Sequence, residues 1–125
     1  MSQPISSLMQ REVYAVDPDA TVQSVEALMV ARGLSWVPVV DKSGIALGVI
    51  SSADLLRFHA DGKQATAVCA WQICSYKPIT VSDDASVNEV ARLMVDTGVH
   101  HVVVTQGTEV KGVVSSLDFV RTFIT

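Results

Sequence analysis

Apolar residues recur in two stretches of the chain at the three- and four-residue spacing of an amphipathic helix. Each stretch follows a short extended piece, residues 13–16 in the first case and 79–81 in the second. The apolar positions are Val22, Val25, Leu28 and Met29 in the first stretch and Val87, Val90, Ala91 and Met94 in the second. This spacing predicts two helices, each with one face directed to a core.

Short polar residues and glycines indicate where these helices start and stop. Thr21 and Ser86 precede the first apolar position and are N-cap candidates. Ser86 and Glu89 have the spacing of a capping box. Gly33 and Gly98 follow the last apolar positions, where a left-handed residue commonly ends a helix.

Two extended runs and a last helix follow each of these helices. The β-branched runs are 37–40 and 102–104, the turns 41–44 and 106–107, and the second strands 47–50 and 110–114. Ser52 and Ser116 are N-cap candidates for a last helix with Asp54 or Asp118 in its first turn. The order β-α-β-β-α therefore occurs twice, which predicts the α+β fold class.

The two halves of the chain are copies of one another. A shift of 65 residues superimposes 16–22 on 81–87, and a shift of 64 superimposes 48–54 on 112–118. Matched positions at a shift that changes by only one residue over most of a chain indicate a duplication. We assign residues 1–58 to the first repeat, 59–72 to a linker and 73–125 to the second repeat.

Composition and charge limit the classes of partner. The 125-residue chain is 49% hydrophobic and 18% charged, with a mean hydropathy of +0.36. These values exclude intrinsic disorder and lead us to expect self-association as a homodimer. Nine basic and thirteen acidic residues give a net charge of −4. The basic residues form no run that could neutralise a phosphate backbone, so we expect no nucleic-acid partner.

The sequence indicates a cytoplasmic protein. No apolar stretch approaches the roughly 18 residues of a membrane span, and residues 1–4 lack the features of a signal peptide. Cys69 and Cys74 lie five positions apart, which is not the spacing of a redox or zinc pair. We expect both to be small apolar side chains rather than a disulfide.

Several motifs carry a resemblance to a known family. Residues 16–22 read Val-Asp-Pro-Asp-Ala-Thr-Val, and residues 33–39 read Gly-Leu-Ser-Trp-Val-Pro-Val. The pattern Gly-hydrophobic-hydrophobic-Ser-x-x-Asp-hydrophobic occurs twice, at 48–55 and 112–119. In these features the chain resembles the cystathionine β-synthase (CBS) domain, in the tandem pair called a Bateman module. The resemblance covers nearly the whole chain.

The resemblance implies both a fold and a function. In that family two β-α-β-β-α repeats pack with pseudo-twofold symmetry and leave two clefts that commonly hold adenosyl ligands. The usual ligands are AMP, ADP, ATP and S-adenosylmethionine, and their binding regulates a partner protein rather than catalysing a reaction. We therefore expect a non-catalytic module without a catalytic cofactor, whose adenosyl ligand controls a protein that the sequence does not identify.

The aspartates of the duplicated pattern are the candidate ribose ligands. A carboxylate has two acceptor oxygens and can accept both hydroxyls of a ribose cis-diol, and a helix start favours its ionised form. Ser51 and Ser115 precede the same helices as Asp54 and Asp118, where hydroxyl and backbone N–H groups suit a phosphate. The alternative is that these serines and aspartates only cap helices.

The resemblance implies that each cleft draws residues from both copies. One set is Asp118, Ser115, Leu117, Tyr14, Leu34, Ser35, His100 and His101. The other set is Asp54, Ser51, Ala53, Ile79, Val99, His100 and Trp36. The two histidines either contact the phosphate or belong to the end of a strand. Trp36 either stacks on adenine or fills its cleft.

The motifs also bear on ligand charge and on rival functions. Neither pattern places a Lys or Arg where a triphosphate needs one, which favours AMP or an S-adenosyl compound over ATP. The alternative function is a ligand-free dimerisation or scaffold module. We expect no enzyme, because the sequence has no nucleophile–base constellation and no Gly-x-Ser-x-Gly elbow. We expect no metal site, because His100 and His101 lack further ligands.

Overall fold

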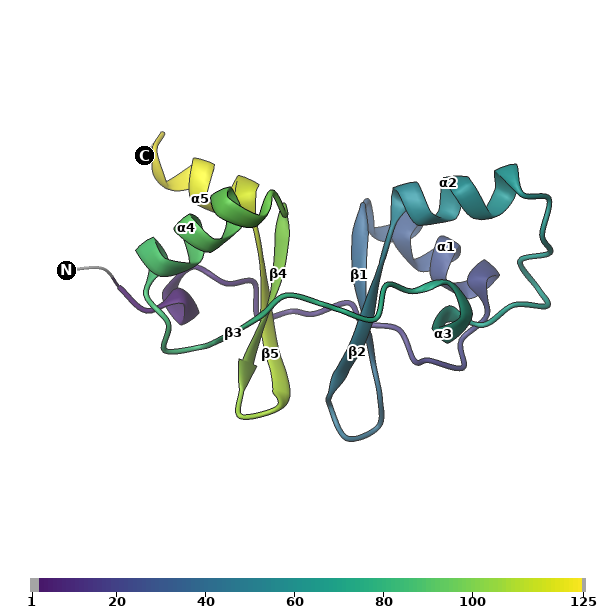
Figure 1. Cartoon of the computed structure of the whole chain (residues 1–125), viewed down its shortest axis with the longest axis horizontal. Helices are drawn as coiled ribbons and strands as arrows, with labels where there is room; N and C mark the ends of the chain where they lie inside the picture. The colour runs from purple at the N-terminus through teal and green to yellow at the C-terminus, as the bar shows by residue number, and fades with distance from the viewer. Residues whose placement is uncertain (1–2, 125) are drawn as a thin grey trace. The chain divides into compact units, whose positions relative to one another are not determined.

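The computed structural model of the chain, shown in Figure 1, describes residues 3–124. These residues form two compact units. Residues 14–78 make up one, the central unit, and residues 3–13 together with 79–124 make up the other, the terminal unit. None of the helices in the described range is long and apolar enough to cross a membrane.

The central unit combines a β-hairpin with three helices. Its elements are α1 (Val22–Arg32), β1 (Trp36–Val40), β2 (Ala46–Ser51), α2 (Ser52–Ala60) and α3 (Ala70–Ile73). Strands β1 and β2 pair antiparallel, and Val16 adds a short parallel bridge to Val39. Within this unit the three helices lie on one side of the hairpin (Figure 1).

The terminal unit combines a three-stranded sheet with two helices and a 3-10 turn. Its elements are η1 (Ile5–Ser7), β3 (Thr80–Ser82), α4 (Val87–Thr97), β4 (His101–Gln106), β5 (Glu109–Ser115) and α5 (Ser116–Thr122). The strand order is β3-β4-β5, with β3 parallel to β4 and β4 antiparallel to β5. Both units mix helices with sheet, which confirms the predicted α+β class.

A separate apolar cluster is buried in each unit. The central cluster is Val16, Val25, Met29, Val37, Val39, Ile50, Ala70 and Cys74. The terminal cluster is Ile5, Met9, Val90, Met94, Val102, Val104 and Val114. Four of these residues, Val25, Met29, Val90 and Met94, are apolar positions that the helical spacing selected, so the predicted buried faces of α1 and α4 are confirmed.

The ends of α1 and α4 also follow the prediction. Thr21 Oγ1 accepts the N–H of Ser24 at 3.2 Å, and Ser86 Oγ accepts the N–H of Glu89 at 3.0 Å. Gly33 and Gly98 end the two helices with φ of 64° and 73°, the left-handed conformation that a glycine adopts without a Cβ penalty.

The N-caps of α2 and α5 were predicted one residue too late. Ser51 and Ser115 are the caps, while Ser52 and Ser116 are the first helical residues. The shift has a physical reason, because an aspartate three residues after Ser51 or Ser115 accepts the backbone N–H of that serine and completes a capping box.

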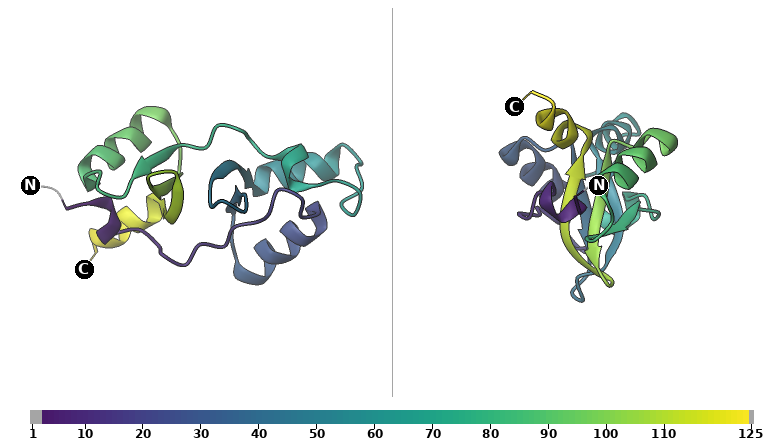
Figure 2. Two further views of the ribbon diagram at one scale, coloured as in Figure 1. Left: turned by 90° about the horizontal axis from the view of Figure 1, so that it is seen from below. Right: turned by 90° about the vertical axis from the view of Figure 1, so that its left-hand side faces the viewer.

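A short helical segment completes each unit at an equivalent place. In the terminal unit the N–H of Ile5 donates to Ala85 O at 2.7 Å, and in the central unit the N–H of Ala70 donates to Ala20 O at 2.8 Å. Ile5 and Ala70 are 65 positions apart, the same shift that relates the repeats. In Figure 2 the purple segment with η1 lies beside the green and yellow elements of the terminal unit.

Each unit therefore contains residues from both sequence repeats. Residues 3–13 precede the first repeat's helix but belong to the unit that holds α4 and α5. The stretch predicted as a linker, residues 59–72, contains the start of α3. The boundaries at 58 and 73 mark the limits of the two similar sequence segments. As limits of functional domains they stay a prediction.

Candidate functional site

The duplicated pattern forms a corner in each unit, where the second strand of a hairpin passes into a helix. In the central unit Ser51 lies opposite Trp36 across β1 and β2. The N–H of Ser52 donates to Ser35 O at 2.9 Å. These residues and Asp54 form what we call the central corner, which brings four predicted site residues together.

Asp54 is held in this corner by its own helix. Its Oδ2 accepts the N–H of Ser51 at 2.8 Å and the hydroxyl of Ser51 at 3.0 Å. Its Oδ1 accepts from the guanidinium of Arg57, one helical turn further on. The Asp54 side chain is 19% exposed, so this carboxylate keeps access to solvent.

The terminal unit repeats this arrangement. Ser115 lies opposite His101 across β4 and β5, and the N–H of Ser116 donates to His100 O at 2.9 Å. With Asp118 these residues form the terminal corner. Asp118 Oδ2 accepts the N–H and the hydroxyl of Ser115 at 2.8 and 3.1 Å, as in the central corner.

The second oxygen of Asp118 has different partners from that of Asp54. Asp118 Oδ1 accepts from Nε2 of Gln10 at 3.0 Å and from Nη1 of Arg121 at 3.4 Å. The Asp118 side chain is only 5% exposed. Sequence reasoning missed Gln10, because it lies 108 residues from Asp118 and outside every motif. The shift of 65 pairs Gln10 with Ser75, which was the only signal pointing to this position.

The serine hydroxyls predicted to meet a phosphate already have partners within the corners. Ser51 Oγ and Ser115 Oγ donate to the carboxylates of Asp54 and Asp118. The capping alternative is therefore realised in both units. The contact of these residues with a ligand stays a prediction.

The electrostatics of the terminal corner keep a histidine neutral. Burial lowers the pKa of His101, and the neighbouring His100 lowers it further, while Asp118 opposes both effects. Desolvation disfavours the charged imidazolium. His101 therefore offers a neutral ring near the buried aspartate, and His100 is exposed.

The remaining predicted residues lie on several elements. Ala53 and Leu117 occupy the first turns of α2 and α5 and are exposed. Ile79 and Val99 pack against the terminal apolar cluster. Tyr14 lies in the central unit, where the guanidinium carbon of Arg32 is 4.9 Å from its ring centroid.

The structure thus divides both predicted sets between the two units. The first set has Asp118, Ser115, Leu117, His100 and His101 in the terminal unit and Tyr14, Leu34 and Ser35 in the central unit. The second set has Asp54, Ser51, Ala53 and Trp36 in the central unit and Ile79, Val99 and His100 in the terminal unit. The members from one unit come together, and the combination across units stays a prediction.

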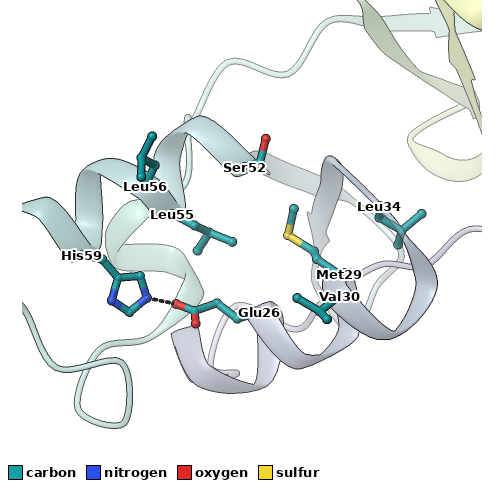
Figure 3. A pocket seen from close by; sticks show the side chains of 8 residues that line it. All are labelled: Glu26, Met29, Val30, Leu34, Ser52, Leu55, Leu56 and His59. Atoms are coloured by element: carbon teal, nitrogen blue, oxygen red, sulfur yellow. Dashed lines mark hydrogen bonds and ion pairs between the residues drawn. The ribbon is translucent and has the colours of Figure 1, made fainter.

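An apolar pocket of about 360 Å³ lies between α1 and α2 of the central unit, shown in Figure 3. Its lining is Glu26, Met29, Val30, Leu34, Ser52, Leu55, Leu56 and His59. His59 Nε2 and Glu26 Oε1 meet at 2.5 Å on one side. Val30 and Leu56 are 84% and 73% exposed, so this pocket is an apolar surface rather than a polar ligand cleft.

A second pocket lies at the terminal corner, and four of the residues that line it have polar side chains. It measures about 330 Å³ and is lined by Leu8, Gln10, Asp118, Arg121 and Thr122. Within residues 3–124 no three His, Cys, Asp or Glu side chains are grouped as metal ligands. Both cysteines are free thiols, and burial raises the pKa of Cys74.

Comparison with known proteins identifies the family of this chain. The model of the CBS domain family matches residues 5–61 and 70–124. An uncharacterized protein from Methanopyrus kandleri is 29% identical over 119 residues, which is 94% of this chain and 61% of that protein. The chain therefore spans less than two thirds of the length of this curated relative.

Two solved structures share the fold. A CBS domain protein from Pyrobaculum aerophilum complexed with AMP has a TM-score of 0.83 at 26% identity, covering 92% of this chain and 88% of that one. The CBS domain pair of protein MJ0100, in complex with 5′-methylthioadenosine and S-adenosyl-L-methionine, has a TM-score of 0.85 at 22% identity, covering 98% and 97%. With two matched segments over most of its length, the chain belongs to the CBS domain family as a tandem pair of CBS domains.

Proposed function

We propose that this chain is a non-catalytic regulatory module that senses an adenosyl ligand. The observation that carries the proposal is the repeated corner, in which Asp54 and Asp118 are each held at a helix start by a capping box. A carboxylate fixed in this way can accept ribose hydroxyls. The AMP, methylthioadenosine and S-adenosylmethionine complexes of the two similar structures support this ligand class.

The proposed roles follow the chemistry of each side chain. Asp54 and Asp118 accept hydroxyls of the ribose. Ser51 and Ser115 orient the two carboxylates through their hydrogen bonds. The predicted apolar and backbone contacts to adenine are those of Tyr14, Leu34 and Ser35. The other predicted members of the clefts are Ala53, Leu117, Ile79 and Val99. His100, His101 and Trp36 keep the two alternative roles described above.

The charge of the corners favours AMP or an S-adenosyl compound over ATP. Arg57 and Arg121 lie one turn beyond Asp54 and Asp118 and pair with those carboxylates. A guanidinium that neutralises an aspartate is less available to the extra charges of a triphosphate. The ligand preferred by this proposal therefore carries less negative charge than ATP.

The mechanism is a shift of population between conformations. A ligand that binds one arrangement of the pair more tightly than another moves the equilibrium toward it by its difference in affinity. The protein regulated in this way would recognise the favoured arrangement. No catalytic step is part of this mechanism.

Thermal unfolding with added ligand tests the proposal. AMP or S-adenosylmethionine at about 100 times its dissociation constant stabilises a protein by roughly 2.7 kcal/mol, which raises Tm by several degrees. We expect this shift for the natural chain and its loss in the double variant Asp54→Ala, Asp118→Ala. Asp96→Asn, which changes an exposed carboxylate on α4, is the control. The absence of any shift with AMP, ATP or S-adenosylmethionine would contradict the proposal.

A dimerisation or scaffold module is the second candidate function. The observation that favours it is the apolar pocket between α1 and α2, with Val30 and Leu56 largely exposed. Large apolar residues also lie exposed on the helices of the terminal unit, among them Val95 and Val120. Exposed apolar surface of this kind is typical of association sites. We propose a homodimer as the assembly, whether or not the module also binds a ligand.

A further inference from the structure

The two corners differ in the residue that pairs with the second hairpin strand. In the terminal unit Gln10 pairs with Val113 through two backbone hydrogen bonds of 2.8 and 3.0 Å. In the central unit Ser75 pairs with Val49 through two of 2.9 and 3.0 Å. Asp118 and Asp54 each lie five residues after the paired valine. Gln10 therefore has the same backbone relation to Asp118 that Ser75 has to Asp54.

Only the glutamine is seen to reach its aspartate. Nε2 of Gln10 donates to Asp118 Oδ1 at 3.0 Å, where Arg121 also donates. With the two bonds from Ser115, all four acceptor positions of the Asp118 carboxylate have a donor. For Asp54, the described residues supply two donors from Ser51 and one from Arg57.

This difference changes what each carboxylate can offer a ribose. A cis-diol brings two hydroxyl donors and needs free acceptor positions on the carboxylate. Within residues 3–124 one acceptor position of Asp54 has no donor. Arg57 and Arg121 are 69% and 62% exposed, so the ion pair at either aspartate is weak and easily displaced. At Asp118 the diol has to displace the amide of Gln10, whose backbone is fixed on β5.

We propose that Gln10 is a specificity-determining residue that restricts ribose binding at Asp118, so that the two CBS corners are unequal and the ligand binds at Asp54. This inference rests on the proposed adenosyl function and assigns the regulation of its sites. At ligand concentrations near the dissociation constant of the Asp54 site, the module then binds one ligand molecule per chain. Gln10 acts as a positioning residue, because it affects ligand binding through its hydrogen bond to Asp118 and not by contacting the ligand.

Exchange of the two equivalent residues tests the inference. Isothermal titration calorimetry with AMP, and in parallel with S-adenosylmethionine, measures the number of sites and their affinities in the natural chain, Gln10→Ser and Ser75→Gln. We expect one equivalent bound by the natural chain and a second equivalent bound by Gln10→Ser. In Ser75→Gln we expect the affinity of the Asp54 site to fall at least tenfold.

Two further variants identify the aspartate at which the ligand binds. A third is the control for replacing a glutamine by serine. Asp54→Asn is expected to weaken the single site of the natural chain at least tenfold, a larger loss than in Asp118→Asn. Gln106→Ser makes the same change at an exposed position of β4 and is expected to bind like the natural chain. Urea unfolding of each variant establishes that it is folded before titration.

The outcomes separate this inference from the proposed function. One site in the natural chain and two in Gln10→Ser support the inference. Binding that is the same in the natural chain, Gln10→Ser and Ser75→Gln overturns it and leaves the adenosyl function standing. A natural chain whose single site is lost in Asp118→Asn also overturns it. No binding of either ligand by any of these proteins overturns the proposed function and this inference with it.

Discussion

At the scale of single residues, Gly48 and Gly112 show how equivalent positions of the repeats meet different neighbours. A Cβ on Gly48 would lie 2.3 Å from the carbonyl oxygen of Ser75 and 2.9 Å from Cys74 Sγ. A Cβ on Gly112 would lie 2.5 Å from Met9 Sδ, the flexible part of a methionine, and at a less severe 3.0 Å from the carbonyl oxygen of Gln10. The backbone of Ser75 cannot move away as easily as a thioether can, so the two glycines differ in how strictly they are required.

We expect Gly48→Ala to be the more damaging of the two substitutions. Overpacking of a buried contact costs about 1–3 kcal/mol of unfolding free energy. We expect the loss in Gly48→Ala to lie near or above the upper end of this range and the loss in Gly112→Ala to lie near its lower end. Gly62→Ala is the control, because its Cβ has open space and only the positive φ is unfavourable. Urea unfolding gives the three free energies. Equal losses at Gly48 and Gly112 would contradict the argument from neighbours.

The histidine of the terminal corner predicts how stability depends on pH. The pKa of His101 lies below its ordinary value because of burial, with a further contribution from His100. The unfolded chain titrates this group near pH 6.5, so between that pH and the lower folded pKa the unfolded state binds more protons. Stability should therefore fall as pH decreases below about 6.5.

Two measurements check this pH dependence. The free energy of unfolding, measured in urea from pH 7.5 to pH 5, should decline less steeply in His101→Gln than in the natural chain. An NMR titration should give a midpoint for the His101 ring below about 6.5. A midpoint at or above that value would show that the ring is not desolvated in the folded protein.

At the scale of elements, the caps of α1 and α4 make a matched pair. Thr21 and Ser86 each accept the N–H of the residue three positions on. We expect Thr21→Ala and Ser86→Ala each to lower the free energy of unfolding by about 1 kcal/mol, because each leaves a helix N–H without its partner. Gln23→Ala, at an exposed position of α1, should change it by only a few tenths. Losses no larger than that of Gln23→Ala would contradict a capping role.

Local periodicity was sufficient to predict most elements of this fold. The helical and extended runs were found because each has a buried face, and the confirmed positions of Gly33 and Gly98 follow from their left-handed backbone. The N-cap of α2 was misplaced because Ser51 and Ser52 are both capable of capping. The spacing of Ser51 and Asp54 was the available signal, since it closes a capping box and the spacing from Ser52 does not.

Long-range contacts could not be read from the same patterns. Gln10 reaches Asp118 because residues 3–13 belong to the unit that contains β5. The spacing of apolar residues along a short segment does not predict in which unit that segment packs. The sequence could align Gln10 with Ser75 but could not distinguish a side chain that reaches an aspartate from one that does not. This is why the chemistry of the aspartates was predictable and the difference between them was not.

At the scale of the whole molecule, the duplication placed equivalent polar corners in both units, and helices of both units carry exposed apolar side chains. The face of α1 and α2 is hollowed around Val30 and Leu56 and carries the Glu26–His59 contact (Figure 3). On α5, the exposed apolar side chains include Leu117 and Val120. Association through such surfaces would bury apolar area that a monomer leaves in water.

The proposed homodimer predicts that Val30 and Leu56 control assembly. Both are strongly exposed on the apolar pocket, so Val30→Glu and Leu56→Glu would put a charge into any interface that covers it. We expect the natural chain to sediment as a dimer at micromolar concentration and each variant to raise the dissociation constant of the dimer at least tenfold. Gln23→Glu adds the same charge on α1 outside the residues that line the pocket and should leave the dimer intact. A natural chain that stays monomeric at 100 times these concentrations would contradict the prediction, and a dimer unaffected by either variant would show that another surface forms the interface.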